Sequence, residues 1–256
     1  MKILVIPDVH GRTFWKQPCE NINNYDKVVF LGDYLDPYEL EHIKVEEAIN
    51  NFAEIIKFKT KYYDKVILLL GNHDLHYWSD KFLRECGGSR MSTLYHKTIK
   101  DLFWTNEDMF NIAYETAHIL FTHAGYMQEW ATKYSNGQFT IEPTADSLNK
   151  LLIPSPKTAL CAVSYARGGN DNVGSCVWSD VSEKIDFNES NKLINITGVD
   201  KYQIFGHTLQ IDYTEYYDHH KWVHGKPVIN KFWSMLDNGH AYEVNDYNPF
   251  DSIKEI

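Results

Sequence analysis

The sequence predicts an α/β protein whose sheet carries polar residues at one edge. Apolar runs of strand length cover residues 2–7, 27–31 and 65–70, and continuous runs of this kind are typical of strands buried on both faces. A helical pattern separates the second run from the third. Each run is followed by a short segment that combines glycine with aspartate, asparagine or histidine. Together these observations favour strand-helix-strand units with a site at the strand ends.

The elements can be justified in chain order. Residues 43–58 carry apolar side chains at helical spacing, which completes a β-α-β unit over residues 27–70. A helix is expected at residues 75–86, where two glycines end the pattern. Shorter patterns predict a strand pair, a further helix and a strand-rich end, at residues 110–115, 118–121, 145–152, Tyr202–Phe205, 211–217, 221–224, 228–235 and 241–244.

Length and composition favour one globular domain. The chain has 256 residues, of which 43% are hydrophobic, enough for a substantial core. No repeat, low-complexity tract or clear linker divides it. We therefore predict a single domain over residues 1–256, with capping segments at 78–108 and 127–200.

Charge and cysteine usage exclude several classes of protein. The net charge is −10, from 35 acidic and 25 basic residues, which argues against a general nucleic-acid binder. There is no apolar stretch of membrane-spanning length and no signal-like start. We expect no membrane partner and a cytoplasmic location. The cysteines lack regular spacing and are expected to be free thiols, at Cys19, Cys86, Cys161 and Cys176.

Five predicted strands end in the side chains that ligate metals. The carboxyl edge of an α/β sheet is where ligands bind, and adjacent glycines allow tight turns there. The five segments are Asp8-Val9-His10-Gly11, Gly32-Asp33-Tyr34-Leu35-Asp36, Gly71-Asn72-His73-Asp74, His123-Ala124-Gly125 and Gly206-His207-Thr208.

Carboxylate, imidazole and amide oxygen together suit divalent ions such as Mn²⁺, Fe²⁺, Zn²⁺ or Ni²⁺. The side chains are too numerous for one ion, and a carboxylate shared between two ions would give a two-metal hydrolytic centre. One ion could take Asp8, His10 and Asp33, and a second Asp33, Asn72, His123 and His207.

These five motifs, in this order, resemble the calcineurin-like metallophosphoesterase superfamily. The resemblance is closest to its PPP branch, which includes Ser/Thr protein phosphatases and symmetrical diadenosine tetraphosphatases. The Gly-Asp-Tyr-Leu-Asp sequence at 32–36 and the Trp-Ser-Asp sequence at 178–180 match that branch. The resemblance implies a four-layer α/β/β/α sandwich with a helical or loop capping insertion.

The resemblance also implies roles for individual residues. Asp8, His10 and Asp33 match the ligands of a first metal, and Asp33 bridges to a second ion held by the other three candidate ligands. His73 matches the histidine that protonates the leaving-group oxygen, and Asp36 matches the carboxylate that orients it. Two divalent ions are implied, with Mn²⁺ expected and Fe, Zn or Ni as alternatives.

Two departures from the superfamily's patterns narrow the function. Leu209 stands where many nucleases and phosphodiesterases carry a second histidine, which argues against those activities. Pro37 and Tyr38 replace the Arg-Gly of protein phosphatases, so another arginine must bind phosphate.

Three arginines are candidates for the phosphate contact, because guanidinium binds phosphate in a bidentate manner. Arg12 lies two residues after His10, Arg167 lies in a glycine-rich loop, and Arg90 follows Gly-Gly-Ser. For each, the alternative is a solvated surface residue. His76 is expected either to line the substrate cleft or to be a partly exposed helix residue. Asp74 is expected to support the site, by capping the following helix or bonding a ligand histidine.

The predicted function is metal-dependent phosphohydrolysis, in which a dinuclear centre activates water for direct attack on a phosphate ester. A protein-phosphatase-like phosphomonoesterase is favoured, and a symmetrical dinucleoside polyphosphate hydrolase is the alternative. A phosphodiesterase or nuclease and a non-catalytic scaffold rank lower. The expected partner is a phosphorylated substrate, namely a phosphoprotein, a nucleotide or a dinucleoside polyphosphate.

Overall fold

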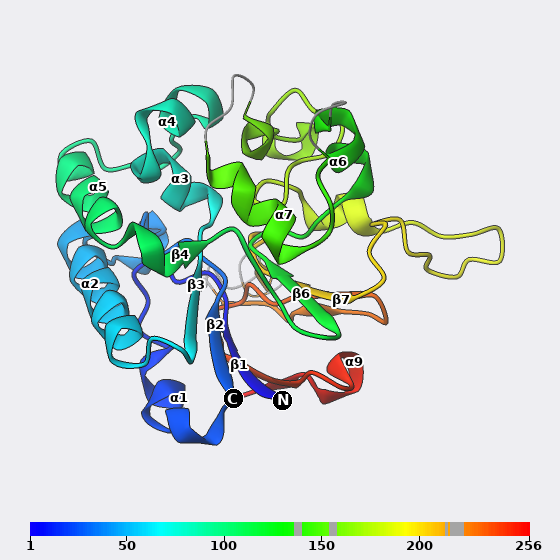
Figure 1. Cartoon of the computed structure of the whole chain (residues 1–256), viewed down its shortest axis with the longest axis horizontal. Helices are drawn as coiled ribbons and strands as arrows, with labels where there is room; N and C mark the ends of the chain where they lie inside the picture. Colours follow the sequence, from blue (N-terminus) through cyan, green and yellow to red (C-terminus); the bar gives the residue numbers. More distant parts are fainter. Residues whose placement is uncertain (136–139, 154–157, 213–214, 216–222) are drawn as a thin grey trace.

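The computed structural model describes residues 1–135, 140–153, 158–212, 215 and 223–256. Two β-sheets lie at the centre of this part of the chain, one of six strands and one of five. Helices flank the sheets, with α2 (Val45–Lys61) beside β3 (Val66–Leu69) and with α7 (Ala145–Asn149) above β6 (Ile119–Thr122) (Figure 1). The predicted α/β class is confirmed.

The first sheet contains the three apolar runs of the N-terminal half as neighbouring parallel strands. Ile3 pairs with Lys27, and Val28 pairs with Val66, so the three strands end at the same edge. The strand order is β11 (Lys254–Glu255), β10 (Tyr242–Asn245), β1 (Lys2–Ile6), β2 (Lys27–Phe30), β3 (Val66–Leu69) and β4 (Phe110–Asn111).

The second sheet supplies the remaining strand ends. Its strands β6, β7 and β9 are parallel neighbours. The apolar segment expected as one strand at 228–235 forms two, β8 and β9, which pair antiparallel. The order is β5 (Ala113–Glu115), β6 (Ile119–Thr122), β7 (Tyr202–Phe205), β9 (Trp233–Met235) and β8 (Val228–Ile229).

The helices follow the predicted pattern in part. The expected helix at 75–86 is two helices that meet at Ser79, whose Oγ accepts the Phe82 N–H and caps the second. The α-helices are α1 (Lys16–Glu20), α2 (Val45–Lys61), α3 (Asn72–Trp78), α4 (Asp80–Cys86), α5 (His96–Thr105), α6 (Gln128–Tyr134), α7 (Ala145–Asn149) and α9 (Pro249–Ser252). Short 3-10 helices cover Ile22–Asn24, Glu39–Glu41, Glu107–Met109, Lys150–Leu152, Ala159–Cys161, Tyr165–Arg167 and Val181–Lys184.

The three apolar strands of the first sheet, β1, β2 and β3, are buried on both faces, as their continuous apolar composition predicted. In β1, Ile3 and Val5 belong to a buried cluster that includes Ile204 of the second sheet. The alternate residue Leu4 belongs to the cluster that includes Phe52 of α2. Burial of each such side chain contributes roughly 1.5–3 kcal/mol to the stability of the fold. The packing on both faces of β1 therefore fixes the position of its end.

Two of the predicted strands fall largely on undescribed positions. The segments 211–217 and 221–224 include residues 213–214 and 216–222, which lie outside the described residues. Ile211 and His224, at their outer ends, pair in an isolated antiparallel bridge. In the described part of the chain, no helix combines the length and the apolar character needed to span a bilayer.

The prediction of four free thiols is wrong for two cysteines. Cys86, at the end of α4, and Cys161 form a disulfide across a sequence separation of 75 residues, with their Cα atoms 4.6 Å apart. No spacing rule relates two cysteines this far apart, so only the fold reveals the pair. Cys19 and Cys176 are free and buried. The disulfide joins the segment 78–108 to the segment 127–200.

Candidate metal centre and active site

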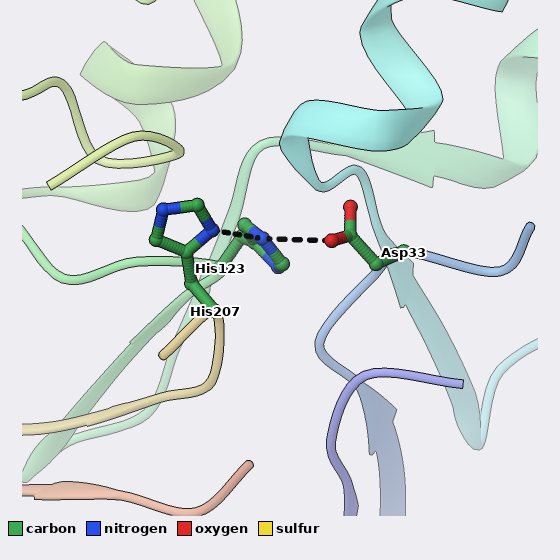
Figure 2. Close-up of side chains that lie close together, drawn as sticks. All are labelled: Asp33, His123 and His207. Carbon is green, nitrogen blue, oxygen red and sulfur yellow. Dashed lines mark hydrogen bonds and ion pairs between the residues drawn. The ribbon is translucent and has the colours of Figure 1, made fainter. Parts of the chain in front are cut away.

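The ends of four strands bring two groups of buried side chains together around one carboxylate. Asp33, after β2, belongs both to a group with Asp8 and His10 and to a group with His123 and His207. All five residues are less than 9% exposed. Figure 2 shows His207 and Asp33 on either side of the His123 imidazole. The fold thus brings these candidate ligands together, and their binding of two ions stays a prediction.

His123 lies at the centre of the second group. Its Nε2 atom is 3.5 Å from Asp33 Oδ2, 3.0 Å from Asn72 Oδ1 and 3.1 Å from His207 Nδ1. In the first group, His10 Nε2 is 3.5 Å from the same Asp33 Oδ2. Four potential ligand atoms, one each from Asp33, Asn72, His123 and His207, therefore lie close together. The Asp33 carboxylate oxygen of this set also lies next to His10 Nε2.

Backbone carbonyls orient the two histidines. His10 Nδ1 is 2.7 Å from Leu35 O, and His123 Nδ1 is 2.9 Å from Leu31 O. A carbonyl only accepts, so each Nδ1 donates its proton to the carbonyl and each Nε2 atom is directed at the Asp33 carboxylate. Two ring nitrogens and a carboxylate that face one another can share a cation. The donor set therefore fits a divalent metal.

The protonation states favour the same interpretation. Burial lowers the pKa of His10 and of His207 well below the usual histidine value, and neutral imidazole is the form that binds metals. His207 Nε2 is buried and has no hydrogen-bond partner. Burial alone would raise the pKa of Asp33, but the neighbouring imidazoles of His123 and His73 outweigh it and hold the pKa below its usual value. Asp33 is therefore ionised.

Two glycines allow the carboxylates to approach the backbone. A Cβ atom on Gly71 would lie 2.1 Å from Asp33 Oδ1, and one on Gly206 would lie 2.0 Å from Asp8 Oδ1. The His207 N–H donates to both oxygens of Asp8, each at 3.0 Å. Any side chain at these glycines would therefore displace a candidate ligand.

Backbone strain is concentrated at the candidate site. Among the described residues, seven other than glycine have a positive φ, a conformation that costs an L-residue roughly 1 kcal/mol or more. Five of the seven are candidate site residues, namely His10, Asp33, Asp36, Arg90 and His207. The surrounding fold must stabilise these conformations, as is common at functional sites.

His73 lies beside the two groups of candidate ligands, and a carboxylate orients its ring. Its Nδ1 atom is 2.9 Å from Asp36 Oδ2, and its backbone N–H donates to Asp33 Oδ1 at 2.9 Å. Tyr77 Oη donates to Asp36 Oδ1 at 2.6 Å. Burial raises the pKa of Asp36, but the hydrogen bonds from His73 and His76 outweigh it and leave the pKa below its usual value. The ionised Asp36 therefore fixes the His73 ring.

His76 and Asp74 are buried behind these side chains. His76 Nε2 lies 2.8 Å from Asp36 Oδ2, so the three residues Asp36, His73 and His76 form a third Asp/His group. Asp74 accepts hydrogen bonds from the backbone N–H groups of Gly71 at 2.8 Å and Asp33 at 2.7 Å. Asp74 thus joins the loops after β2 and β3, rather than bonding a ligand histidine in the described structure.

The comparison with protein families identifies this architecture. The family model for calcineurin-like phosphoesterases matches residues 1–210. The chain belongs to the calcineurin-like phosphoesterase family. Members of this family are metal-dependent, and the chain is a hydrolase of phosphoric esters. The resemblance drawn from the five motifs is confirmed.

Solved phosphatase structures share the fold of this phosphoesterase at low sequence identity. A cold-active protein-tyrosine phosphatase of the psychrophile Shewanella sp. has 16% identity and a TM-score of 0.54, over 99% of this chain and 80% of that chain. A protein serine/threonine phosphatase from Saccharomyces cerevisiae has 13% identity and a TM-score of 0.50, over 100% and 79%. The comparison with curated proteins found no match.

A cavity of about 270 Å³ opens onto the centre of the phosphoesterase. Asn72, His73 and His207 line it together with two arginines, Arg90 and Arg167. His76 and Arg12 are absent from its described lining.

The two arginines are held in different ways. Arg90 Nη2 is 2.9 Å from His73 Nε2, and the Arg90 guanidinium stacks 3.8 Å above the centre of the Tyr38 ring. Arg167 Nε is 2.9 Å from Asp180 Oδ2, and its Nη2 donates to Thr208 Oγ1 at 2.7 Å. Tyr38 thus follows the position where protein phosphatases carry arginine, and it supports a guanidinium from another segment.

Arg12 lies in a buried charged cluster instead. Its Nε is 3.7 Å from Glu41 Oε1, and its Nη2 is 4.0 Å from Asp237 Oδ1. Asp237 is completely buried and was missed by the sequence analysis. It follows β9, which is parallel to β7, so it repeats the pattern of a strand followed by aspartate and glycine. The signal was readable, because aspartate and glycine closely follow the predicted strand 228–235.

Proposed function

We propose that this phosphoesterase is a two-metal phosphomonoesterase that resembles the protein phosphatases. The carrying observation is the Asp33 carboxylate, which two groups of imidazoles and acids share. One ion would bind Asp8, His10 and Asp33, and a second would bind Asp33 with Asn72, His123 and His207. Mn²⁺ is the proposed ion, with Fe, Zn or Ni as alternatives.

Two divalent ions at this position would neutralise the phosphate oxygens and make water acidic enough to attack phosphorus at neutral pH. The protein's own contribution is the fixed arrangement of ligands, since Asp74 joins two ligand-bearing loops and backbone carbonyls orient two imidazoles. Preorganised ligands of this kind avoid reorganisation during the reaction.

We propose His73 as the general acid that gives a proton to the leaving oxygen, with Asp36 as its positioning residue. Asp36 holds Nδ1, so Nε2 is the atom that faces the cavity. Arg90 donates to Nε2 in this conformation. Nε2 therefore accepts a hydrogen bond and carries no proton in this arrangement. The acid role requires Arg90 to exchange His73 for an oxygen of the phosphate, the anion that a guanidinium binds best, and requires Nε2 to take up a proton from solvent before it gives one to the leaving oxygen.

Arg90 and Arg167 are the proposed phosphate-binding residues, because both line the cavity. Arg12 and His76 were also predicted to contact substrate, and neither lines the cavity in the described structure. We propose that Arg12 stabilises the loop after β1 through Glu41 and that His76 supports Asp36.

The wider description of the protein follows the sequence analysis. We propose a single domain over residues 1–256, with segments 78–108 and 127–200 as the cap that selects the phosphorylated substrate. The cytoplasm is the proposed location. The Cys86–Cys161 disulfide is an argument against it, because disulfides persist mainly in oxidising compartments. Non-reducing mass spectrometry of protein alkylated inside intact cells would show whether the bond forms there, and fractionation of the same cells would give the location.

The test of the proposed function is a screen of metals against substrates with metal-stripped protein. Mn²⁺, Ni²⁺, Zn²⁺ and Mg²⁺ are each combined with nitrophenyl phosphate, bis-nitrophenyl phosphate, a phosphopeptide and diadenosine tetraphosphate. We expect Mn²⁺-dependent hydrolysis that is fastest on a monoester. Faster diester hydrolysis would support a phosphodiesterase, and faster tetraphosphate hydrolysis the dinucleotide alternative. Bound ions without turnover would point to a scaffold.

A further inference from the structure

The loop that carries Arg90 borders open space on one side. A second cavity, of about 410 Å³, adjoins the first, because Ser89 lines both. Gly87 and Gly88 also line the second cavity, whereas Arg90 lines only the first. A Cβ atom on Gly87 would meet no atom within 4 Å. Packing against the start of the loop is therefore sparse, and other contacts must hold Arg90 at the candidate active site.

The Arg90 guanidinium is not neutralised by an acidic side chain. Arg12 and Arg167 each have a carboxylate oxygen within 4.0 Å, whereas no carboxylate of the described residues forms such a pair with Arg90. Arg90 is exposed, and its φ of 59° is uncommon for a residue other than glycine. The guanidinium thus keeps its charge for an anion, and its position depends on neutral groups.

The Tyr38 ring is one of these neutral groups. The guanidinium carbon of Arg90 lies 3.8 Å from the centre of the ring, and Tyr38 lines the first cavity. Tyr38 also makes a T-shaped contact with the His10 imidazole, with 5.0 Å between the ring centres. A guanidinium stacked on a ring keeps its N–H groups available for hydrogen bonds in its own plane. Tyr38 therefore orients Arg90 without competing for the phosphate.

The Tyr77 hydroxyl connects the backbone of the same loop to the pair of His73 and Asp36. Tyr77 lies in α3, one turn after His73, and is completely buried. Its Oη donates to Asp36 Oδ1 at 2.6 Å and accepts a hydrogen bond from the Ser92 N–H at 2.8 Å. Ser92 comes two residues after Arg90. One hydroxyl therefore holds both the carboxylate that orients His73 and the loop that carries Arg90.

We propose that Tyr38 and Tyr77 are the positioning residues that make Arg90 a phosphate-binding arginine. Tyr77 fixes the backbone of the loop, and Tyr38 fixes the plane of the guanidinium. Together they supply the cation that the sequence lacks at Pro37, where protein phosphatases carry arginine. The inference rests on the proposed function, because Arg90 must bind the reacting phosphate.

The test measures how strongly inorganic phosphate inhibits the hydrolysis of nitrophenyl phosphate by the Mn²⁺-loaded full chain. Inorganic phosphate takes no proton from His73, so its inhibition constant reports binding contacts alone. Tyr38→Leu should raise this constant and the KM about fivefold, with little change in kcat. Tyr38→Phe keeps the ring and should bind phosphate within about twofold of the wild type.

Tyr77→Phe should also raise the inhibition constant about fivefold, because the Ser92 N–H loses its partner. The matched control is Tyr202→Phe, which removes another buried hydroxyl with two partners, Asn230 O at 2.8 Å and Ser234 Oγ at 2.6 Å. This control should leave the inhibition constant unchanged. The effects of Tyr38→Leu and Tyr77→Phe should disappear in an Arg90→Ala background, because both tyrosines act through Arg90.

Each outcome bears on the two tyrosines. Unchanged phosphate binding in Tyr38→Leu or Tyr77→Phe, or equal losses with and without Arg90, would overturn the inference while turnover of nitrophenyl phosphate upheld the proposed function. Equal losses in Tyr38→Phe and Tyr38→Leu would contradict the stacking role. If Tyr77→Phe does not fold, the two Tyr38 variants decide. Absence of turnover in the wild type would remove the proposed function and the inference together.

Discussion

The candidate metal centre at the strand ends and the cap segment 78–108 differ in how the fold positions their side chains. Asp33, His123 and His207 lie directly after buried strands, and each is 7% exposed or less. Arg90 lies in a loop between α4 and α5, is exposed, and is held by one ring and one imidazole. We propose that the metal chemistry resides at the strand ends, whereas substrate choice is expected to reside in loops that can change without disturbing the core.

The first prediction addresses the shared carboxylate and carries the largest expected effect. Asp33→Asn removes the charge that both metal groups use and should lower kcat on the order of 10⁴-fold, with loss of bound metal. Metal analysis and nitrophenyl phosphate turnover measure both effects. Full metal content with near-normal turnover would show that Asp33 bridges nothing.

The second prediction concerns the proton donor. His73→Ala should retain bound metal and lower kcat on the order of 10³-fold on an alkyl phosphate. The loss should be smaller on nitrophenyl phosphate, because nitrophenolate leaves without protonation. His118→Ala is the matched control, since that half-exposed histidine precedes the same strand, β6, that His123 follows. Equal losses on both esters would exclude an acid role.

The third prediction tests whether the disulfide between the two cap segments stabilises the fold without affecting metal binding at the strand ends. Reduction of the Cys86–Cys161 bond releases a constraint over 75 residues, which corresponds to roughly 4 kcal/mol of unfolding free energy in the chain-entropy account. Urea unfolding with and without dithiothreitol measures the change, and Cys86→Ser with Cys161→Ser should remove it. Metal content should stay constant, and its loss on reduction would connect the two regions.

The smallest expected effect is that of removing the Arg90 guanidinium from the cap segment 78–108. Arg90→Ala removes a phosphate contact and should lower kcat/KM about 10- to 100-fold. Arg84→Ala is the matched control, because Arg84 is an exposed arginine of α4 and lines neither cavity. Steady-state kinetics with a phosphopeptide distinguish the two. Identical kinetics for both variants would remove Arg90 from the site.

The same difference explains what the sequence could predict. Asp8, Asp33 and His207 were predicted because each follows a continuous apolar run, and parallel strands must end at one edge. Asp237 follows the same rule, because it comes two residues after the predicted strand 228–235, and the sequence analysis overlooked it. The break at Ser79 was also readable, since serine followed by aspartate is a common helix start.

The cap features were beyond local patterns. The approach of Arg90 to His73 depends on a left-handed backbone at Arg90 and on the Tyr38 ring below it. The Cys86–Cys161 pair depends on contact between α4 and the 3-10 helix Ala159–Cys161. Neither arrangement leaves a periodic signal, because both result from tertiary packing between distant segments.

The most direct test of the account is the number of metal ions bound per chain. Protein stripped with chelator, reloaded with Mn²⁺ and freed of excess ion by gel filtration is analysed by plasma mass spectrometry. The shared Asp33 carboxylate predicts about two ions per wild-type chain and loss of both in Asp33→Asn. One ion or none in the wild type, or two ions retained in Asp33→Asn, would contradict a bridged two-metal centre.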